Sequence, residues 1–217
     1  MTFPVLKGVS EAPDPALRCG DWLATVRIKV STMSKTADKY WNRIFDDSTS
    51  LYERFLGSGT LERLNLKFGG LENETKWSRL RAEVSGKLLE SIPESMSTEC
   101  VSDRKTHPTQ LVYRVLIGFQ PGGTAERAAL IKTVENIGTF TSPAEGVASI
   151  KTWERRKTRA LELGATLPDS TVLLRAIDAA LKDILVQYPN MAFRINLRRD
   201  EIKIEGKPTL EKVETLM

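Results

Sequence analysis

The stretch of residues 141–169 constrains the fold most, because it carries the start, the body and the end of one long helix. Ser142 can cap a helix, Pro143 suits the first helical position, and Glu145 can reach back to the cap amide. Gly164 can adopt the left-handed conformation that ends a helix. A segment with both boundaries marked is a strong helix prediction, so we interpret the rest of the chain around it.

The body of this stretch has two different sides. Apolar residues recur on one broad arc at about 100° per residue, as in an amphipathic helix. These residues are Val147, Ile150, Trp153, Ala160 and Leu161. The other side is basic and holds Lys151, Arg155, Arg156, Lys157 and Arg159. We expect the apolar stripe to enter a core around Trp153.

Composition sets limits on the class of protein. The 217 residues are 41% hydrophobic and 28% charged, which is typical of one large or two small globular domains. A net charge of +4 is too small to identify a partner. Two cysteines and one histidine cannot supply a four-ligand zinc site or a disulfide framework. No signal peptide or long apolar run is visible, so we expect an intracellular protein with no membrane partner.

The rest of the chain reads as a series of amphipathic helices with short links. Prolines and glycines predict an extended arm over residues 1–19. Two segments also permit strands: residues 22–33, where we favour helix, and residues 191–204, where Phe193, Ile195 and Leu197 alternate with polar residues. The sum is an all-α fold of about nine or ten helices. The restart at TSPAE predicts two lobes, 20–140 and 141–217.

Residues able to carry chemistry are few and scattered. The glycines of FQPGGTAER and GSGTLER lack the G-K-[ST] of a phosphate loop, so we interpret them as turns. His107 is predicted to lie in a loop and Cys100 to be a small packing residue. Trp22, Trp41, Trp77 and Trp153 each fall on an apolar stripe and are predicted to be core anchors. We therefore expect no enzyme activity, cofactor, metal or small-molecule substrate.

The basic side of the 141–169 helix is the one candidate binding surface. Lys151, Arg155 and Arg159 are spaced four residues apart, so a helix places them in one row, with Arg156 beside it. Such a row can contact nucleic-acid phosphates. It can also be a solvated helix face with local pairs such as Arg159 with Glu162. The solvated face is favoured, because a single basic row without interleaved aromatic residues is common.

The order of these segments resembles the capsid-forming Gag region of LTR retrotransposons, copia-type elements in particular. The segment GDWLATVRIKVSTMSKTADKYWNRIF is similar to the family's opening pair of tryptophan-containing helices. SRLRAEVSGKLLESIPESM resembles its central amphipathic helix, and PTLEKVETL its closing segment. The stretch SPAEGVASIKTWERRKTRALELGATLPD resembles a helix of the second half, with the family's ending at Leu161, Gly164, Leu167 and Asp169.

The resemblance implies a two-lobed α-helical capsid protein that multimerises with copies of itself into a cytoplasmic, virus-like particle around the element's RNA. It implies that the helix around Trp153, with Val147, Ile150 and Leu161, forms the core of the C-terminal lobe and its contact surface. The family often carries a C-x-x-C-x-x-x-x-H-x-x-x-x-C zinc knuckle, and this sequence has none. An alternative interpretation is a helical nucleic-acid-binding module without particle assembly.

Overall fold

The computed structural model describes residues 2–11, 14–64, 66 and 75–216. Within these ranges the chain forms eleven α-helices and one short 3₁₀ helix, η1 (Thr75–Trp77), with no strand. This confirms the predicted all-α class. The sequence also predicts a short helix after Thr60 that closes at Gly69-Gly70. The structure has a helix over Thr60–Leu64, and Gly69-Gly70 lies outside the described residues.

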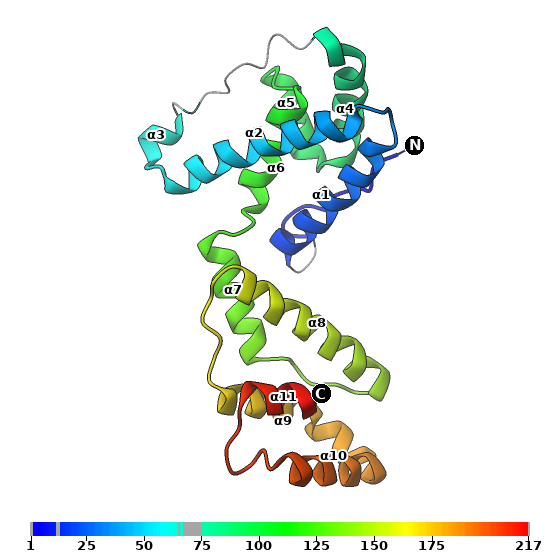
Figure 1. Cartoon of the computed structure of the whole chain (residues 1–217), viewed down its shortest axis with the longest axis vertical. Helices are drawn as coiled ribbons and strands as arrows, with labels where there is room; N and C mark the ends of the chain where they lie inside the picture. Colours follow the sequence, from blue (N-terminus) through cyan, green and yellow to red (C-terminus); the bar gives the residue numbers. More distant parts are fainter. Residues whose placement is uncertain (1, 12–13, 65, 67–74, 217) are drawn as a thin grey trace. The chain divides into compact units, whose positions relative to one another are not determined.

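The chain divides into two compact units, residues 1–123 and 124–217, which we describe separately. Figure 1 shows the helices of both. Unit 1 contains α1 (Pro15–Ser31), α2 (Ala37–Gly57), α3 (Thr60–Leu64), α4 (Ser78–Ser91), α5 (Glu94–Ser102) and α6 (Pro108–Phe119). Unit 2 contains α7 (Thr124–Glu135), α8 (Pro143–Glu162), α9 (Ser170–Gln187), α10 (Pro189–Ile202) and α11 (Leu210–Leu216).

The division falls after Gly123, whereas the sequence placed it between residues 140 and 141. The helix α7 makes the difference, because it packs along α8 and also contacts α9. The capping signals of residues 141–145 therefore mark the start of a helix inside unit 2. A strong local helix start and a domain boundary look alike in sequence, and only the packing of α7 separates them.

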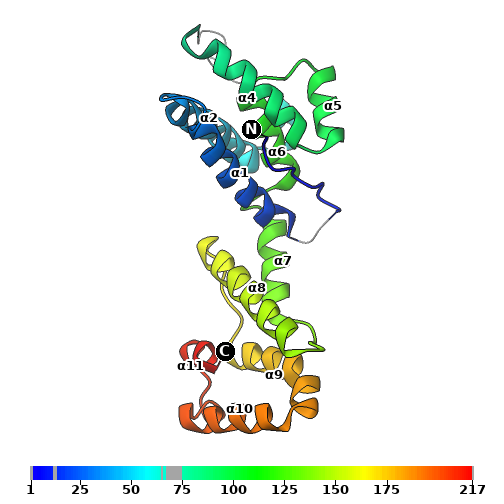
Figure 2. The ribbon, with the colours of Figure 1, turned by 90° about the vertical axis from the view of Figure 1, so that its right-hand side faces the viewer.

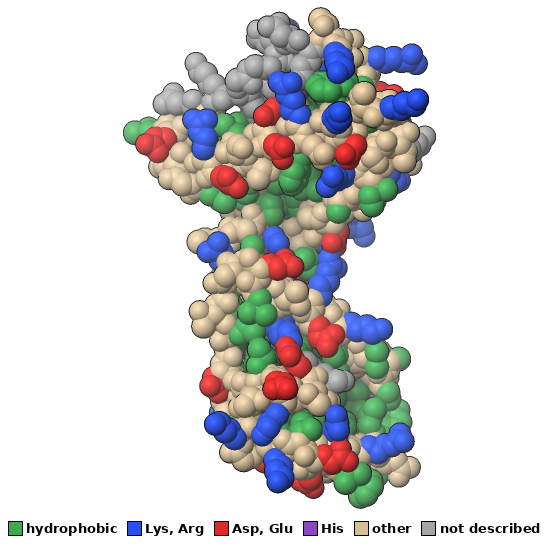
Figure 3. All heavy atoms as spheres, viewed as in Figure 1, with side chains coloured by type: hydrophobic (Ala, Val, Ile, Leu, Met, Phe, Trp, Pro, Cys, Tyr) green, Lys and Arg blue, Asp and Glu red, His purple; other side chains and the backbone are tan. Residues whose placement is uncertain are grey.

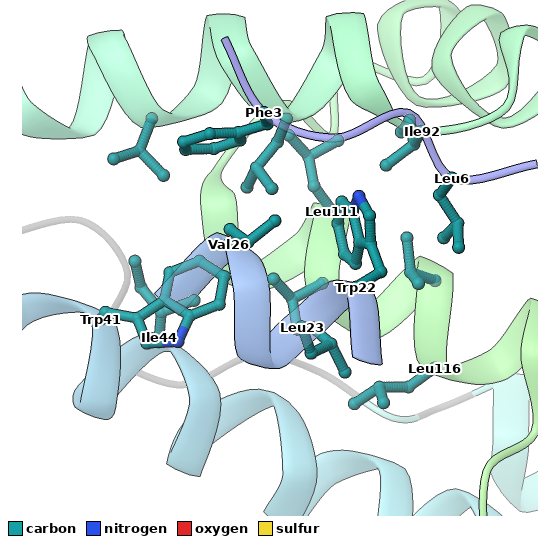
Figure 4. Close-up of a cluster of buried hydrophobic side chains, with 14 of the residues drawn as sticks. Phe3, Leu6, Trp22, Leu23, Val26, Trp41, Ile44, Ile92, Leu111 and Leu116 are labelled. Atoms are coloured by element: carbon teal, nitrogen blue, oxygen red, sulfur yellow. The ribbon is translucent and has the colours of Figure 1, made fainter. Parts of the chain in front are cut away.

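The core of unit 1 is built by α1, α2, α4 and α6 (Figure 4). The helix α6, the most apolar segment of the chain, is also its most deeply buried: Leu111, Val112 and Val115 are fully enclosed. Trp22 and Trp41 are buried in the same core, as predicted. Trp77 is only half-buried in η1, where its ring lies against Tyr40.

The N-terminal arm is extended, as predicted, and it packs against the helices of unit 1. Phe3 and Leu6 are buried in the core, as Figure 4 shows. The Leu6 amide donates to the Ser91 carbonyl at 2.7 Å. The Trp22 indole N–H donates to the Pro4 carbonyl at 2.8 Å. The arm is shorter than expected, because α1 begins at residue 15 with a proline in its first turn.

The core of unit 2 forms where α7, α8, α9 and α11 meet. Trp153 is buried there and donates its indole N–H to the Val134 carbonyl at 2.9 Å. The remaining buried members of this cluster are Leu173, Leu174, Ile177, Ile204 and Val213. A smaller cluster of Phe140, Ala180 and Ile184 lies beside it, with Ile150 packed against it.

Local signals determine the ends of α8. Ser142 accepts the Glu145 amide at 3.3 Å, so the predicted cap is confirmed. The Glu145 carboxylate accepts the Thr141 amide at 2.9 Å, one residue before the amide predicted for it. Gly164 has a φ of 67°, the left-handed conformation predicted to end the helix. The Asp169 carboxylate then caps α9 by accepting the Thr171 amide at 2.8 Å.

The two ambiguous segments are both helical. Residues 22–33 fall mostly in α1, and residues 191–204 fall mostly in α10. A strand needs a neighbouring strand to pair its backbone groups, and the described residues contain none. Pro189 suits the first turn of a helix, and α10 packs on α9 and α11.

Candidate functional site

The apolar residues predicted for α8 separate into a buried and an exposed group. Trp153 is buried, and Ile150 is half-buried against the smaller cluster. Val147 is 56% exposed and Leu161 is 49% exposed, so the prediction that these two belong to the core is wrong. Both lie on the same side of the arc, whereas Trp153 and Ala160, toward its other side, are buried.

The basic residues of α8 also divide into an exposed group and a partly buried group. Lys151 and Arg155 are exposed and lie one turn apart, while Arg156 is half-buried. Arg159 is half-buried and binds two carboxylates, Glu126 at 3.1 Å and Glu162 at 3.2 Å. The predicted nucleic-acid row is therefore incomplete, because its third member holds α8 to α7. The predicted local pair of Arg159 and Glu162 is present.

Lys157 has a role that the sequence prediction missed. The sequence places Lys157 on the basic side of the helix, but in the structure this residue is buried. Its ammonium lies 5.3 Å from the centre of the Trp153 ring and forms an ion pair with Glu214 of α11. The spacing of a tryptophan and a lysine four residues apart is a signal for such a cation–π pair. Lys157 therefore connects α8 to α11.

An exposed apolar face of unit 2 lies on α10. Phe193 is 69% exposed and Leu197 is 50% exposed, and α10 has no fully buried residue. Val186 and Tyr188, at the end of α9, are also exposed. In Figure 3, hydrophobic side chains gather near the start of α8 and the corner between α9 and α10. Exposed apolar surface of this kind is typical of protein contacts.

The sequence did not predict the exposed face of α10, because the alternation of apolar and polar residues in this segment is also typical of a strand. At helical spacing the same residues form two apolar sides. Met191 and Ile202 pack toward the core clusters, while Phe193 and Leu197 point away from them. A helical wheel of residues 189–202 separates these two sides from the sequence alone.

No catalytic constellation forms in the described part of the chain. His107 is the N-cap of α6, where its Nδ1 accepts the Thr109 amide at 3.3 Å. Burial and, secondarily, the nearby charge of Arg81 lower the pKa of His107. Burial raises the pKa of the Cys100 thiol, which opposes formation of a reactive thiolate. In the described ranges, no three His, Cys, Asp or Glu side chains gather as metal ligands would.

An open groove of about 390 Å³ lies in unit 1 between the N-terminal arm and the junction of α4 and α5. Its floor is apolar, from Leu6, Ile92 and Pro93. Its charged lining residues, Lys7, Glu11, Glu90 and Glu94, are all exposed. No histidine or cysteine is among the residues that line the groove.

Comparisons of the chain with protein-family models, with curated proteins and with solved structures give no match. Among the described helices, none is both long enough and apolar enough to cross a bilayer.

Proposed function

We propose that this chain is a structural protein that assembles with copies of itself, of the capsid type found in copia-like retrotransposons, into cytoplasmic particles that enclose RNA. The observation that carries the proposal is the set of large apolar side chains exposed on helices of unit 2, including Val147, Val186, Phe193 and Leu197. Exposed apolar side chains on helix faces are typical of protein contact sites, and assembly would bury them against copies of the chain.

Particle assembly suits contacts that are individually weak. A shell repeats each contact many times, so small apolar patches on helix faces are sufficient. The sequence resemblance supports the same function, because it follows the order of the helical segments from about Gly20 to the last helix.

Purified full-length chain provides the test. Light scattering over a series of concentrations and salt conditions should show a sharp rise in mass, and negative-stain microscopy should show particles. RNA inside such particles should resist added nuclease until the particles are dissociated. A chain that stays monomeric at every concentration and salt condition would contradict the proposal.

The second candidate is a helical nucleic-acid-binding module that does not assemble. The observation in its favour is that Lys151 and Arg155 are exposed and one turn apart on α8. Binding through them should weaken steeply as salt rises. The double variant Lys151→Glu and Arg155→Glu should lose affinity for a single-stranded RNA, and the control Lys182→Glu, on exposed α9 surface, should keep it. Equal affinity of both variants would exclude this site.

A further inference from the structure

We propose that unit 1 binds single-stranded RNA at the surface where α2 and α4 begin. Trp77 is the centre of this surface, and Lys35, Lys39 and Lys76 lie around it. We call these four residues the Trp77 patch. The inference rests on the proposed function, because the RNA is the one enclosed in the particle, and it names a part of the chain that contacts that RNA.

Trp77 has a different environment from the other tryptophans. Three of the four tryptophans are buried in the two cores, whereas Trp77 is only half-buried. Its indole N–H donates to the exposed Thr36 hydroxyl at 3.3 Å, and its ring centre lies 5.2 Å from that of Tyr40. These contacts hold the indole at the surface, between η1 and the start of α2. A partly exposed aromatic ring can stack with a base, because every base has a flat π face.

Lysines lie on both sides of the indole. The Lys76 ammonium is 5.3 Å from the centre of the Trp77 ring. Lys35 precedes Thr36, which the indole contacts, and Lys39 follows Thr36 by three residues, the spacing of neighbours on one helix face. All three lysines are exposed, and within the described residues none of them forms an ion pair. The ring is therefore set among cations that can contact phosphates.

The nearby carboxylates of α2 and α4 have cations of their own. Asp38, the acidic residue in the first turn of α2, pairs with Arg27 of α1 at 3.6 Å. Glu83 of α4 lies 4.0 Å from Lys87, one turn further along the same helix. Neither of these carboxylates neutralises the lysines of the patch.

The positive charge continues along α2. Arg43 follows Lys39 by four residues, about 6 Å along the same face of the helix. Its pair with Asp47, at 3.9 Å and about half exposed, is of the weak surface kind that a phosphate can replace. Figures 1 and 2 show in two perpendicular views that α2 and α4 begin at the same end of unit 1. In Figure 3, Lys and Arg side chains gather over this end.

The combination of residues favours a single strand. Proteins that bind single-stranded nucleic acid without sequence preference place aromatic rings among cations, so that bases stack while phosphates pair with the charges. In a duplex the base faces are covered by their neighbours, and an exposed ring has nothing to stack on. The basic side of α8 lacks this combination, because Trp153 is buried.

Charge removal tests the patch in the full-length chain. The probe is a fluorescently labelled oligouridylate about twelve nucleotides long, whose binding is followed by anisotropy. The double variant Lys39→Ala and Lys76→Ala should weaken binding about tenfold at low salt. It should also reduce the slope of log affinity against log salt by about 1.4, since each phosphate contact to a single strand contributes about 0.7.

The matched control removes the same charge from another part of unit 1. Lys7→Ala with Lys105→Ala changes two exposed lysines outside the patch and should keep the affinity within about twofold. Equal losses in the two double variants would overturn the proposal. Binding that is lost only with Lys151→Glu and Arg155→Glu would also overturn it, because the contact would then lie on α8.

Tryptophan fluorescence tests the stacking separately from the charge. Oligouridylate should quench part of the fluorescence of the original chain, and the Trp77→Phe variant should lose that quenching. The phenylalanine keeps a ring beside Tyr40 and can still stack, so the affinity should fall by no more than about threefold. The matched control Trp153→Phe, at a buried position, should keep the quenching. Quenching that persists in Trp77→Phe would contradict a base on this ring.

A membrane surface is the other partner that lysines beside a tryptophan could contact. Vesicles containing phosphatidylserine are therefore the competing probe. They should not displace the labelled RNA. If the Lys39 and Lys76 variant lost binding to these vesicles and kept its binding to RNA, the patch would be a membrane contact and the proposal would be wrong.

Particle assays separate the patch from the proposed function. Particles of the Lys39 and Lys76 variant that form normally but hold little RNA would support both. Particles of this variant that hold the usual amount of RNA would remove the patch and leave self-assembly standing. RNA binding that depends on the patch, in a chain that never forms particles, would leave the patch standing and remove the capsid-type function.

Discussion

The Trp153 indole N–H and the Val134 carbonyl form a buried hydrogen bond of 2.9 Å that joins α8 to α7. Arg159 and Glu126 join the same two helices at 3.1 Å. The side chain of Glu126 is almost completely enclosed, so this pair is shielded from solvent. These contacts explain why α7 belongs to unit 2 although the strong helix start comes after it.

Replacing Trp153 with Phe should destabilise unit 2 by about 2 kcal/mol. The change removes the hydrogen bond to Val134, leaves a buried carbonyl without its partner, and opens a small cavity. Urea denaturation followed by circular dichroism measures the loss. The matched control on the same helix is Val147→Ala, at a 56% exposed position, which should change stability by less than about 0.5 kcal/mol. Equal losses would mean that the two residues have similar environments.

Stability should fall as the pH is lowered below about 6.5, the pKa of an unfolded histidine. The pKa of His107 is lowered in the fold, by burial and then by Arg81. As the pH falls, the unfolded chain therefore takes up the proton before the folded chain does. The free energy of unfolding decreases from the unfolded pKa down to the pKa of His107 in the fold. Protonation also removes the Nδ1 acceptor that caps α6.

Thermal melting between pH 5 and 7.5 tests the role of His107, because the chain has no other histidine. His107→Asn keeps a side chain that can cap a helix and has no proton to gain in this range. The variant should flatten the slope of melting temperature against pH near 6. An unchanged slope would assign the pH dependence to other groups.

Two glycine-to-alanine changes should act in opposite directions. Gly164→Ala should cost about 1 kcal/mol, because Gly164 has a φ of 67°, where a Cβ is strained. Gly86→Ala should stabilise by about 0.5–1 kcal/mol, because Gly86 lies inside α4 and a Cβ there meets nothing within 4 Å. Thermal denaturation of both variants shows whether each change raises or lowers the stability. Two changes in the same direction would be incompatible with these backbone conformations.

The Ser142→Ala variant should destabilise α8 by about 1 kcal/mol, because the Glu145 amide loses its acceptor. Ser142→Asp keeps an acceptor at the same position and places a negative charge at the positive end of the helix. It should therefore match or exceed the original stability in the same urea titration. A loss with aspartate as large as with alanine would show that the cap contributes little.

Local chemistry made much of the helical layout predictable. Ser142, Gly164 and Asp169 act on backbone groups within a few residues of themselves, so their roles could be inferred without any knowledge of the fold. The same holds for the all-α class, which follows from the helical spacing of apolar residues throughout the chain. The predicted assembly surface and RNA contact are statements about partners, and they stay predictions.

The starts and ends of most helices follow from the sequence, because caps, prolines and glycines act through their nearest neighbours. Which helices share a core, and which side chains stay outside it, follows from how the helices pack. This packing buries Lys157 beside Trp153, engages Arg159 with Glu126, and leaves Leu161 exposed. Burial depends on what packs against a helix face, and those partners come from distant parts of the chain.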